Sequence, residues 1–123
     1  MTKRKEIYRC LICGNVVEVI NSGAGELVCC RKPMIIENEN SDDSASKEKH
    51  VPYIKDKKVS IGKIEHPMEE SHYIAWIEAK SKEGRIERVY LNPGEKPETE
   101  FNFEVESARA FCNLHGLWKG IKI

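Results

Sequence analysis

Short apolar runs separated by polar turns fill the second part of the chain. Runs rich in β-branched and aromatic residues occupy residues 51–55, 58–64, 73–79, 85–91, 101–106, 109–112 and 117–123. They predict strands, because such side chains pack well on a pleated surface, and no segment keeps the 3.6-residue repeat of an amphipathic helix. Seven short strands within about 74 residues favour an all-β fold, a β-sandwich of immunoglobulin-like type.

The N-terminal part of the chain carries a smaller strand pattern. Residues 6–20 predict two short strands around a cysteine-bearing turn, and residues 25–30 predict a third. A unit of about 36 residues is too small to be stabilised by a hydrophobic core alone, and a bound metal is the usual remedy. Polar residues 37–49 follow without a large apolar side chain. We therefore expect domains at 1–38 and 50–123, joined by a linker at about 39–49.

Charge and the absence of long apolar runs narrow the class of protein. Twenty basic residues balance twenty acidic ones, which argues against a nucleic-acid binder. No stretch has the length of a membrane span, and the basic start lacks the apolar run of a secretory signal. A cytoplasmic protein without membrane contact is the expectation. In that reducing compartment, closely spaced cysteines bind metal or perform redox chemistry more often than they form disulfides.

Four of the five cysteines form one candidate metal site: Cys10, Cys13, Cys29 and Cys30. The two-residue spacing followed by Gly14 predicts a tight turn that presents two thiolates to one ion. Neighbouring residues in a strand point to opposite faces, so the adjacent pair can share that ion only where the chain turns sharply. Zinc and iron both suit four sulfurs. A redox-active dithiol beside two buried thiols is the metal-free alternative.

The fifth cysteine and every histidine lie in the second part of the chain: His50, His66, His72, Cys112 and His115. Taken singly, a loop histidine is solvated and a cysteine at the end of an apolar strand is a small buried hydrophobe. Taken together, five ligands are one too many for an ordinary structural zinc site. Four equatorial imidazoles and an axial thiolate would leave one octahedral position open for a small oxygen species. Iron suits this ligand set and one-electron chemistry.

Several stretches together resemble desulfoferrodoxin, the two-iron form of superoxide reductase. They are residues 8–15, 26–30, 48–52, 66–78 and 112–119, and they occur in the family's order. The N-terminal part resembles desulforedoxin, a small rubredoxin-like iron module. The C-terminal part resembles the catalytic β-sandwich that the one-iron relatives, the neelaredoxins, have by themselves.

The resemblance implies two iron ions per chain and a set of ligands for each. The first iron would be bound by Cys10, Cys13, Cys29 and Cys30. The catalytic iron would have His50, His66, His72 and His115 as equatorial ligands and Cys112 as its axial ligand. Glu48 matches the glutamate that occupies the sixth position in the oxidised resting state, and Lys49 matches the lysine near the open position.

The same resemblance implies an activity and partners. Superoxide and two protons would give hydrogen peroxide, with the electron supplied by ferrous iron and restored by a rubredoxin or a similar small donor. A homodimer is also expected. Three other hypotheses stay open: an electron-transfer or iron-binding protein without turnover, a zinc-stapled interaction module, and a dismutase. Iron content tests the second, and oxygen release without a reductant identifies the third.

Overall fold

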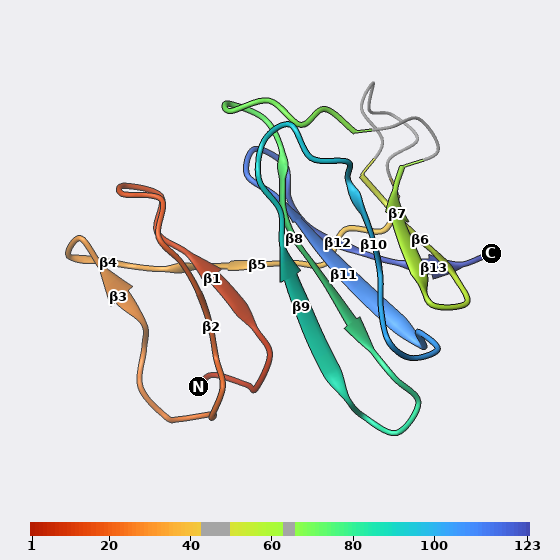
Figure 1. Ribbon diagram of the computed structural model, residues 1–123. Helices are drawn as coiled ribbons and strands as arrows, with labels where there is room; N and C mark the ends of the chain where they lie inside the picture. The colour runs from red at the N-terminus through yellow and green to blue at the C-terminus, as the bar shows by residue number, and fades with distance from the viewer. Residues whose placement is uncertain (43–49, 63–65) are drawn as a thin grey trace. The chain divides into compact units, whose positions relative to one another are not determined.

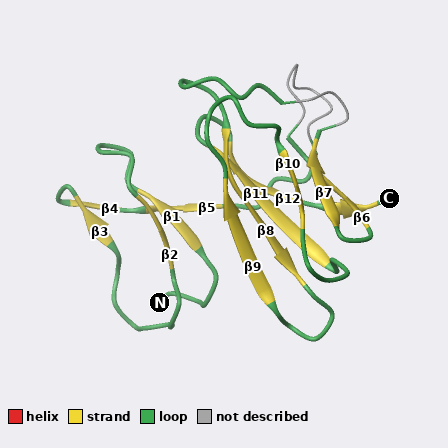
Figure 2. Ribbon diagram, viewed as in Figure 1, coloured by secondary structure: helices red, strands yellow, loops and turns green. Residues whose placement is uncertain are grey.

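The computed structural model describes residues 1–42, 50–62 and 66–123. The chain divides into two compact units, Met1–Asn38 and Glu39–Ile123. None of the described residues is helical, as Figure 2 shows, so the predicted all-β fold is confirmed. The described segments also contain no helix with the length and apolarity needed to span a membrane.

The first unit contains a three-stranded antiparallel sheet and a separate hairpin. The sheet has the order β2-β1-β5, and its strands are β1 (Ile7–Arg9), β2 (Val16–Glu18) and β5 (Ile35–Glu37). The hairpin consists of β3 (Val28–Cys29) and β4 (Lys32–Pro33). The strands predicted around the cysteine turn and at residues 25–30 are confirmed, whereas β4 and β5 were not predicted. Ile7, Cys10 and Val19 are the buried hydrophobic residues of this unit.

The second unit contains two four-stranded sheets (Figure 1). One has the order β10-β7-β6-β13, with β6 (Pro52–Lys55), β7 (Lys58–Ile61), β10 (Glu98–Glu100) and β13 (Ile121–Lys122). The other has the order β12-β11-β8-β9, with β8 (Ile74–Lys80), β9 (Ile86–Tyr90), β11 (Ser107–Cys112) and β12 (Gly116–Lys119). Every pairing is antiparallel except that of β13 with β6.

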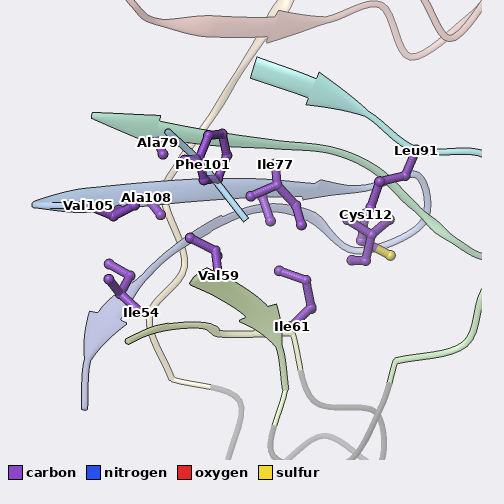
Figure 3. Close-up of a cluster of buried hydrophobic side chains, with 12 residues drawn as sticks. Ile54, Val59, Ile61, Ile77, Ala79, Leu91, Phe101, Val105, Ala108 and Cys112 are labelled. Atoms are coloured by element: carbon purple, nitrogen blue, oxygen red, sulfur yellow. The ribbon is translucent and has the colours of Figure 1, made fainter. Parts of the chain in front are cut away.

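Buried side chains from both sheets form one core, shown in Figure 3. Alternate residues of β8 and β11, including Ile77, Ala79, Ala108 and Ala110, face Ile54, Val59 and Ile61 of the opposite sheet. This two-residue repeat is the one expected of half-buried strands. Cys112 lies at one end of the cluster in Figure 3.

The strand predicted at residues 101–106 is wrong. Strand β10 lies earlier, at Glu98–Glu100, although Phe101 and Val105 are buried in the core. The N–H groups of these two residues donate to the carbonyls of Lys57 and Asp56, in the turn between β6 and β7, at 2.8 and 2.9 Å. The segment therefore has the apolar pattern of a strand but bonds to a turn rather than to a neighbouring strand.

The run predicted as one strand at residues 117–123 is divided at Gly120. Strand β12 pairs with β11 in one sheet, and β13 pairs with β6 in the other, so the chain crosses between sheets here. A Cβ atom at Gly120 would lie 3.1 Å from the carbonyl oxygen of Pro52 and 3.2 Å from that of Ala108. Glycine permits this close backbone approach.

Candidate metal centres

The four cysteines of the first unit gather at one candidate metal centre, the four-cysteine centre. Their sulfurs lie within 4.8 Å of one another, with Cys13 Sγ 3.6 Å from Cys29 Sγ and Cys29 Sγ 4.0 Å from Cys30 Sγ. All four thiols are free, so no disulfide competes for them. Cys10 and Cys13 come from the turn after β1, and the other two come from the β3–β4 hairpin.

Backbone conformation explains how both cysteine pairs reach one point. Gly14 has a φ of 84° and donates its N–H to the carbonyl of Cys10 at 3.0 Å, which closes the first turn. Cys30 and Arg31 have φ values of 52° and 64° and form the two-residue loop between β3 and β4. Positive φ at both loop residues is the pattern of a type I′ turn. The sharp turn expected between Cys29 and Cys30 is thus confirmed.

The protonation of these thiols fits a bound cation. The pKa of Cys10 is lowered to about 6, first because the backbone N–H of Cys13 donates to its sulfur. The pKa of Cys30 is raised to about 12, because the thiol groups of Cys13 and Cys10, and then that of Cys29, interact with its sulfur. Cysteines bind metals as thiolates, so a metal ion at this centre would supply the positive charge that several neighbouring thiolates need.

The second candidate centre lies where four strands end. Strand β6 begins at Pro52, which pairs with Ile61 at the end of β7. Strand β8 begins at Ile74, which pairs with Cys112 at the end of β11. Cys112 is a member of the second pair, and His50 lies two residues before the first. The sandwich therefore brings together strand ends that are far apart in the sequence.

All five predicted side chains of the second unit converge there, in a group that we call the histidine–cysteine centre. His50, His66, His72 and Cys112 place ligand atoms within 4.8 Å of one another. His115 Nδ1 lies 3.0 Å from His50 Nε2 and 3.8 Å from Cys112 Sγ. His66 Nε2 lies 3.6 Å from the same sulfur. The group comprises four imidazoles and one thiol, which are ligands that iron, copper and zinc accept.

The hydrogen bonding of two histidines in this centre fits a bound metal ion. His66 Nδ1 lies 2.7 Å from the carbonyl oxygen of Pro67, which only accepts, so Nδ1 carries the proton and Nε2 presents its lone pair. Such a bond is the usual second contact of a metal-binding histidine. His72 Nε2 is buried and has no hydrogen-bond partner among the described residues. Buried polar atoms are normally satisfied, so the donor set fits a metal ion.

A β-bulge places Cys112 in the cluster. Phe111 pairs with Trp76, but Cys112 pairs with Ile74, so Ala75 is skipped. Bulges are common beside active sites because they re-aim a side chain without breaking the sheet. Here the shift sets Ile74 and Cys112 opposite each other, and both are 0% exposed.

Two contacting residues were not among the predicted site residues. The Trp118 ring stacks on the His50 ring, with centroids 4.6 Å apart, and its Nε1 donates to the carbonyl of His115 at 3.1 Å. Asn113 bonds to the two neighbours of His72. Neither had a signal in the sequence, because a tryptophan in an apolar strand is typical of a core and an asparagine after a strand is typical of a turn.

Two further predicted residues, Glu48 and Lys49, lie outside the described residues. The structure therefore places His50 but not the pair before it. Their predicted roles stay predictions.

Two family models match the chain, one for each unit. The model described as Desulfoferrodoxin, N-terminal domain, matches residues 2–36, and the model described as Desulfoferrodoxin matches residues 42–121. The four-cysteine centre and the histidine–cysteine centre agree with the two iron centres of that family.

Individual proteins give the same picture. The desulfoferrodoxin of Syntrophotalea carbinolica is 50% identical over 124 residues, covering 96% of this chain and 97% of that one. The superoxide reductase of Pyrococcus abyssi is 36% identical over 96 residues, covering 58% of this chain and 84% of that one. The crystal structure of the superoxide reductase from Treponema pallidum has a TM-score of 0.74 at 28% identity, covering 94% and 97% of the two chains. With both family models matched and 50% identity to a relative over nearly its whole length, this chain belongs to the desulfoferrodoxin family.

Proposed function

We propose that this chain is a superoxide reductase, which converts superoxide and two protons to hydrogen peroxide with one electron. The convergence of four imidazoles and one thiol at the end of the sandwich carries the proposal. The relatives from Pyrococcus abyssi and Treponema pallidum, both named superoxide reductases, support it.

We assign the ligands as the sequence predicts. His50, His66, His72 and His115 would bind the catalytic iron together with Cys112, and His115 would bind through Nδ1, the nitrogen that faces the sulfur. Iron held there would supply the single electron that superoxide accepts. A divalent cation among four neutral imidazoles and one thiolate keeps a net positive charge, and that charge attracts a small anion.

Burial around the cluster favours entry from one side. Cys112 is 0% exposed and His50 and His66 are buried, whereas His72 is half-buried and His115 is exposed. Among the candidate ligands that the structure describes, His72 and His115 are therefore the ones that face solvent. Superoxide would enter past these two residues, while the buried sulfur keeps its electron-donating role away from water.

Residues next to His50 would assist capture. We propose that Lys49 would add positive charge near the bound iron and that Glu48 would bind the iron in the oxidised resting state. A local positive field accelerates the encounter with an anion even on a chain whose net charge is zero.

The four-cysteine centre would be accessory. Cys10, Cys13, Cys29 and Cys30 would hold a second iron, which stabilises the first unit and can exchange electrons. A rubredoxin or a similar small protein would restore the electron after each turnover, and the chain would act as a homodimer.

A stopped-flow experiment tests the activity. The iron-loaded, reduced chain is mixed with superoxide, while peroxide, oxygen and the visible spectrum are followed together. One peroxide per superoxide, with oxidation of the iron and no oxygen release, supports the reductase. Oxygen release without a reductant would indicate a dismutase, unchanged superoxide an electron-transfer protein, and a chain purified with zinc alone an interaction module.

A further inference from the structure

His72 is carried by a tight turn at the start of β8. The N–H of Glu69 donates to the carbonyl of His72 at 2.9 Å, and the N–H of His72 donates to the carbonyl of Glu69 at 3.1 Å. At the start of this turn, the carbonyl of Met68 accepts the N–H of Gly94 at 2.7 Å. These bonds close the turn and attach it to the loop after β9. They do not set its distance from the hairpin that carries Cys112 and His115.

Asn113 bridges the turn and that hairpin. Its side-chain Oδ1 accepts the N–H of Tyr73 at 2.8 Å, and its Nδ2 donates to the carbonyl of Ser71 at 3.0 Å. Its backbone N–H also donates to the carbonyl of Tyr73 at 3.2 Å. Ser71 and Tyr73 are the two neighbours of His72 in the sequence. One residue therefore holds the backbone on both sides of a candidate ligand.

We propose that Asn113 is a positioning residue that sets His72 against Cys112 and His115. Asn113 follows Cys112, the last residue of β11, directly, so the bridge to the His72 turn starts one residue after the sulfur. The inference rests on the proposed ligand set, in which His72 binds the metal, and does not depend on the substrate.

The amide is the group that this bridge requires. It accepts at one end and donates at the other, as the N–H of Tyr73 and the carbonyl of Ser71 demand. A carboxylate of the same shape accepts at both ends and would lose the bond to Ser71. An alanine would lose both of these side-chain bonds and keep the backbone bond to Tyr73.

Asn113→Ala should weaken iron binding at the histidine–cysteine centre by about 10–100-fold, the usual cost of losing a contact that orients a metal ligand. The full chain is loaded with ferrous iron, and iron is withdrawn by a competing chelator. The thiolate-to-iron absorption of this centre in its oxidised form, which reports the geometry around the sulfur, should shift or weaken. Asn113→Asp, which keeps one side-chain bond, should fall between Asn113→Ala and the unchanged chain.

Asn102→Ala is the matched control, because Asn102 is an exposed asparagine of the same unit and lies outside the cluster. It should leave both readouts unchanged, and the four-cysteine centre should absorb normally in every variant. Equal iron affinity and an equal spectrum in Asn113→Ala and the unchanged chain would overturn the inference. A loss of iron affinity accompanied by a matching drop in the melting temperature of the metal-free chain would also overturn it, since that would indicate a general folding defect.

Cys112→Ser separates this inference from the ligand set on which it rests. Loss of the thiolate absorption in Cys112→Ser, together with an unchanged Asn113→Ala, would reject the positioning role alone. Retention of that absorption in Cys112→Ser would reject the ligand set and the positioning role with it. Failure to turn over superoxide, with the spectra as expected, would reject only the proposed activity.

Discussion

Cys112 is both fully buried and surrounded by ring nitrogens. Its sulfur lies 3.6 Å from His66 Nε2 and 3.8 Å from His115 Nδ1, and its residue is 0% exposed. A buried thiol in an apolar core is normally inert, whereas a thiolate bound to a metal is stabilised by the ion. The single sulfur is therefore the position where the metal and metal-free interpretations differ most.

Replacing this sulfur should remove the candidate chemistry while leaving the fold intact. Cys112→Ser should abolish the thiolate-to-iron absorption of the histidine–cysteine centre. It should slow superoxide reduction at least about tenfold, equivalent to about 1.4 kcal/mol of barrier. Absorption and stopped-flow measurements on the iron-loaded variant check both. A variant that keeps the band would show that another residue supplies the ligand.

Lys49 allows a test of electrostatic attraction of superoxide to the centre. Lys49→Ala should slow superoxide capture by about tenfold or more at low ionic strength and flatten the dependence of the rate on salt, because steering fields are screened. Lys82→Ala is the control, since Lys82 lies in the turn after β8, at the opposite end of that strand from Ile74. Identical rates for the two variants at low salt would remove Lys49 from the mechanism.

At the scale of elements, turns and strand ends matter more than strand interiors. The type I′ turn at Cys30 and Arg31 brings the sulfurs of Cys29 and Cys30 to the same site. The β-bulge at Ala75 orients the side chain of Cys112. The crossing at Gly120 brings β13 beside β6, the strand that His50 precedes. The turn and the bulge therefore place candidate ligands at the two centres.

Gly120→Val should destabilise the sandwich. The added side chain would press on the backbone carbonyls of Pro52 and Ala108, which belong to strands of different sheets. Overpacking of this kind costs about 1–3 kcal/mol. Thermal unfolding measures it against Gly25→Val, because nothing lies within 4 Å of a Cβ at Gly25. Equal melting temperatures for the two variants would contradict the prediction.

The two units differ in what stabilises them. The second has a core of twelve buried residues, while the first buries Ile7, Cys10 and Val19. So few buried side chains cannot offset the conformational entropy of a unit this size. We therefore expect the first unit to depend on a bound metal for its stability.

Removing that metal should unfold the first unit alone. With the iron stripped by a chelator, or in Cys13→Ser, residues 1–38 should lose protection in amide hydrogen exchange while β8 and β11 stay protected. Structural metals of this kind contribute about 10–16 kcal/mol to folding in small zinc modules. A metal-free first unit that stayed protected would mean that other contacts stabilise it.

The side chains that gather at the two candidate centres could be chosen from the sequence, and so could the all-β class. Cysteine spacing is local, so the sequence alone indicates the turn geometry at Cys10–Cys13 and at Cys29–Cys30. Strand propensity is local as well, yet it fails at residues 101–106, where the buried residues Phe101 and Val105 bond to a distant turn.

The meeting of His50, His66, His72, Cys112 and His115 depends on the fold, because strand pairing and the crossing at Gly120 join segments far apart in the chain. The contacts of Asn113 with the His72 turn and of Trp118 with His50 depend on the fold too. Hydrogen bonds and ring stacking require positions in space that spacing along the sequence does not specify.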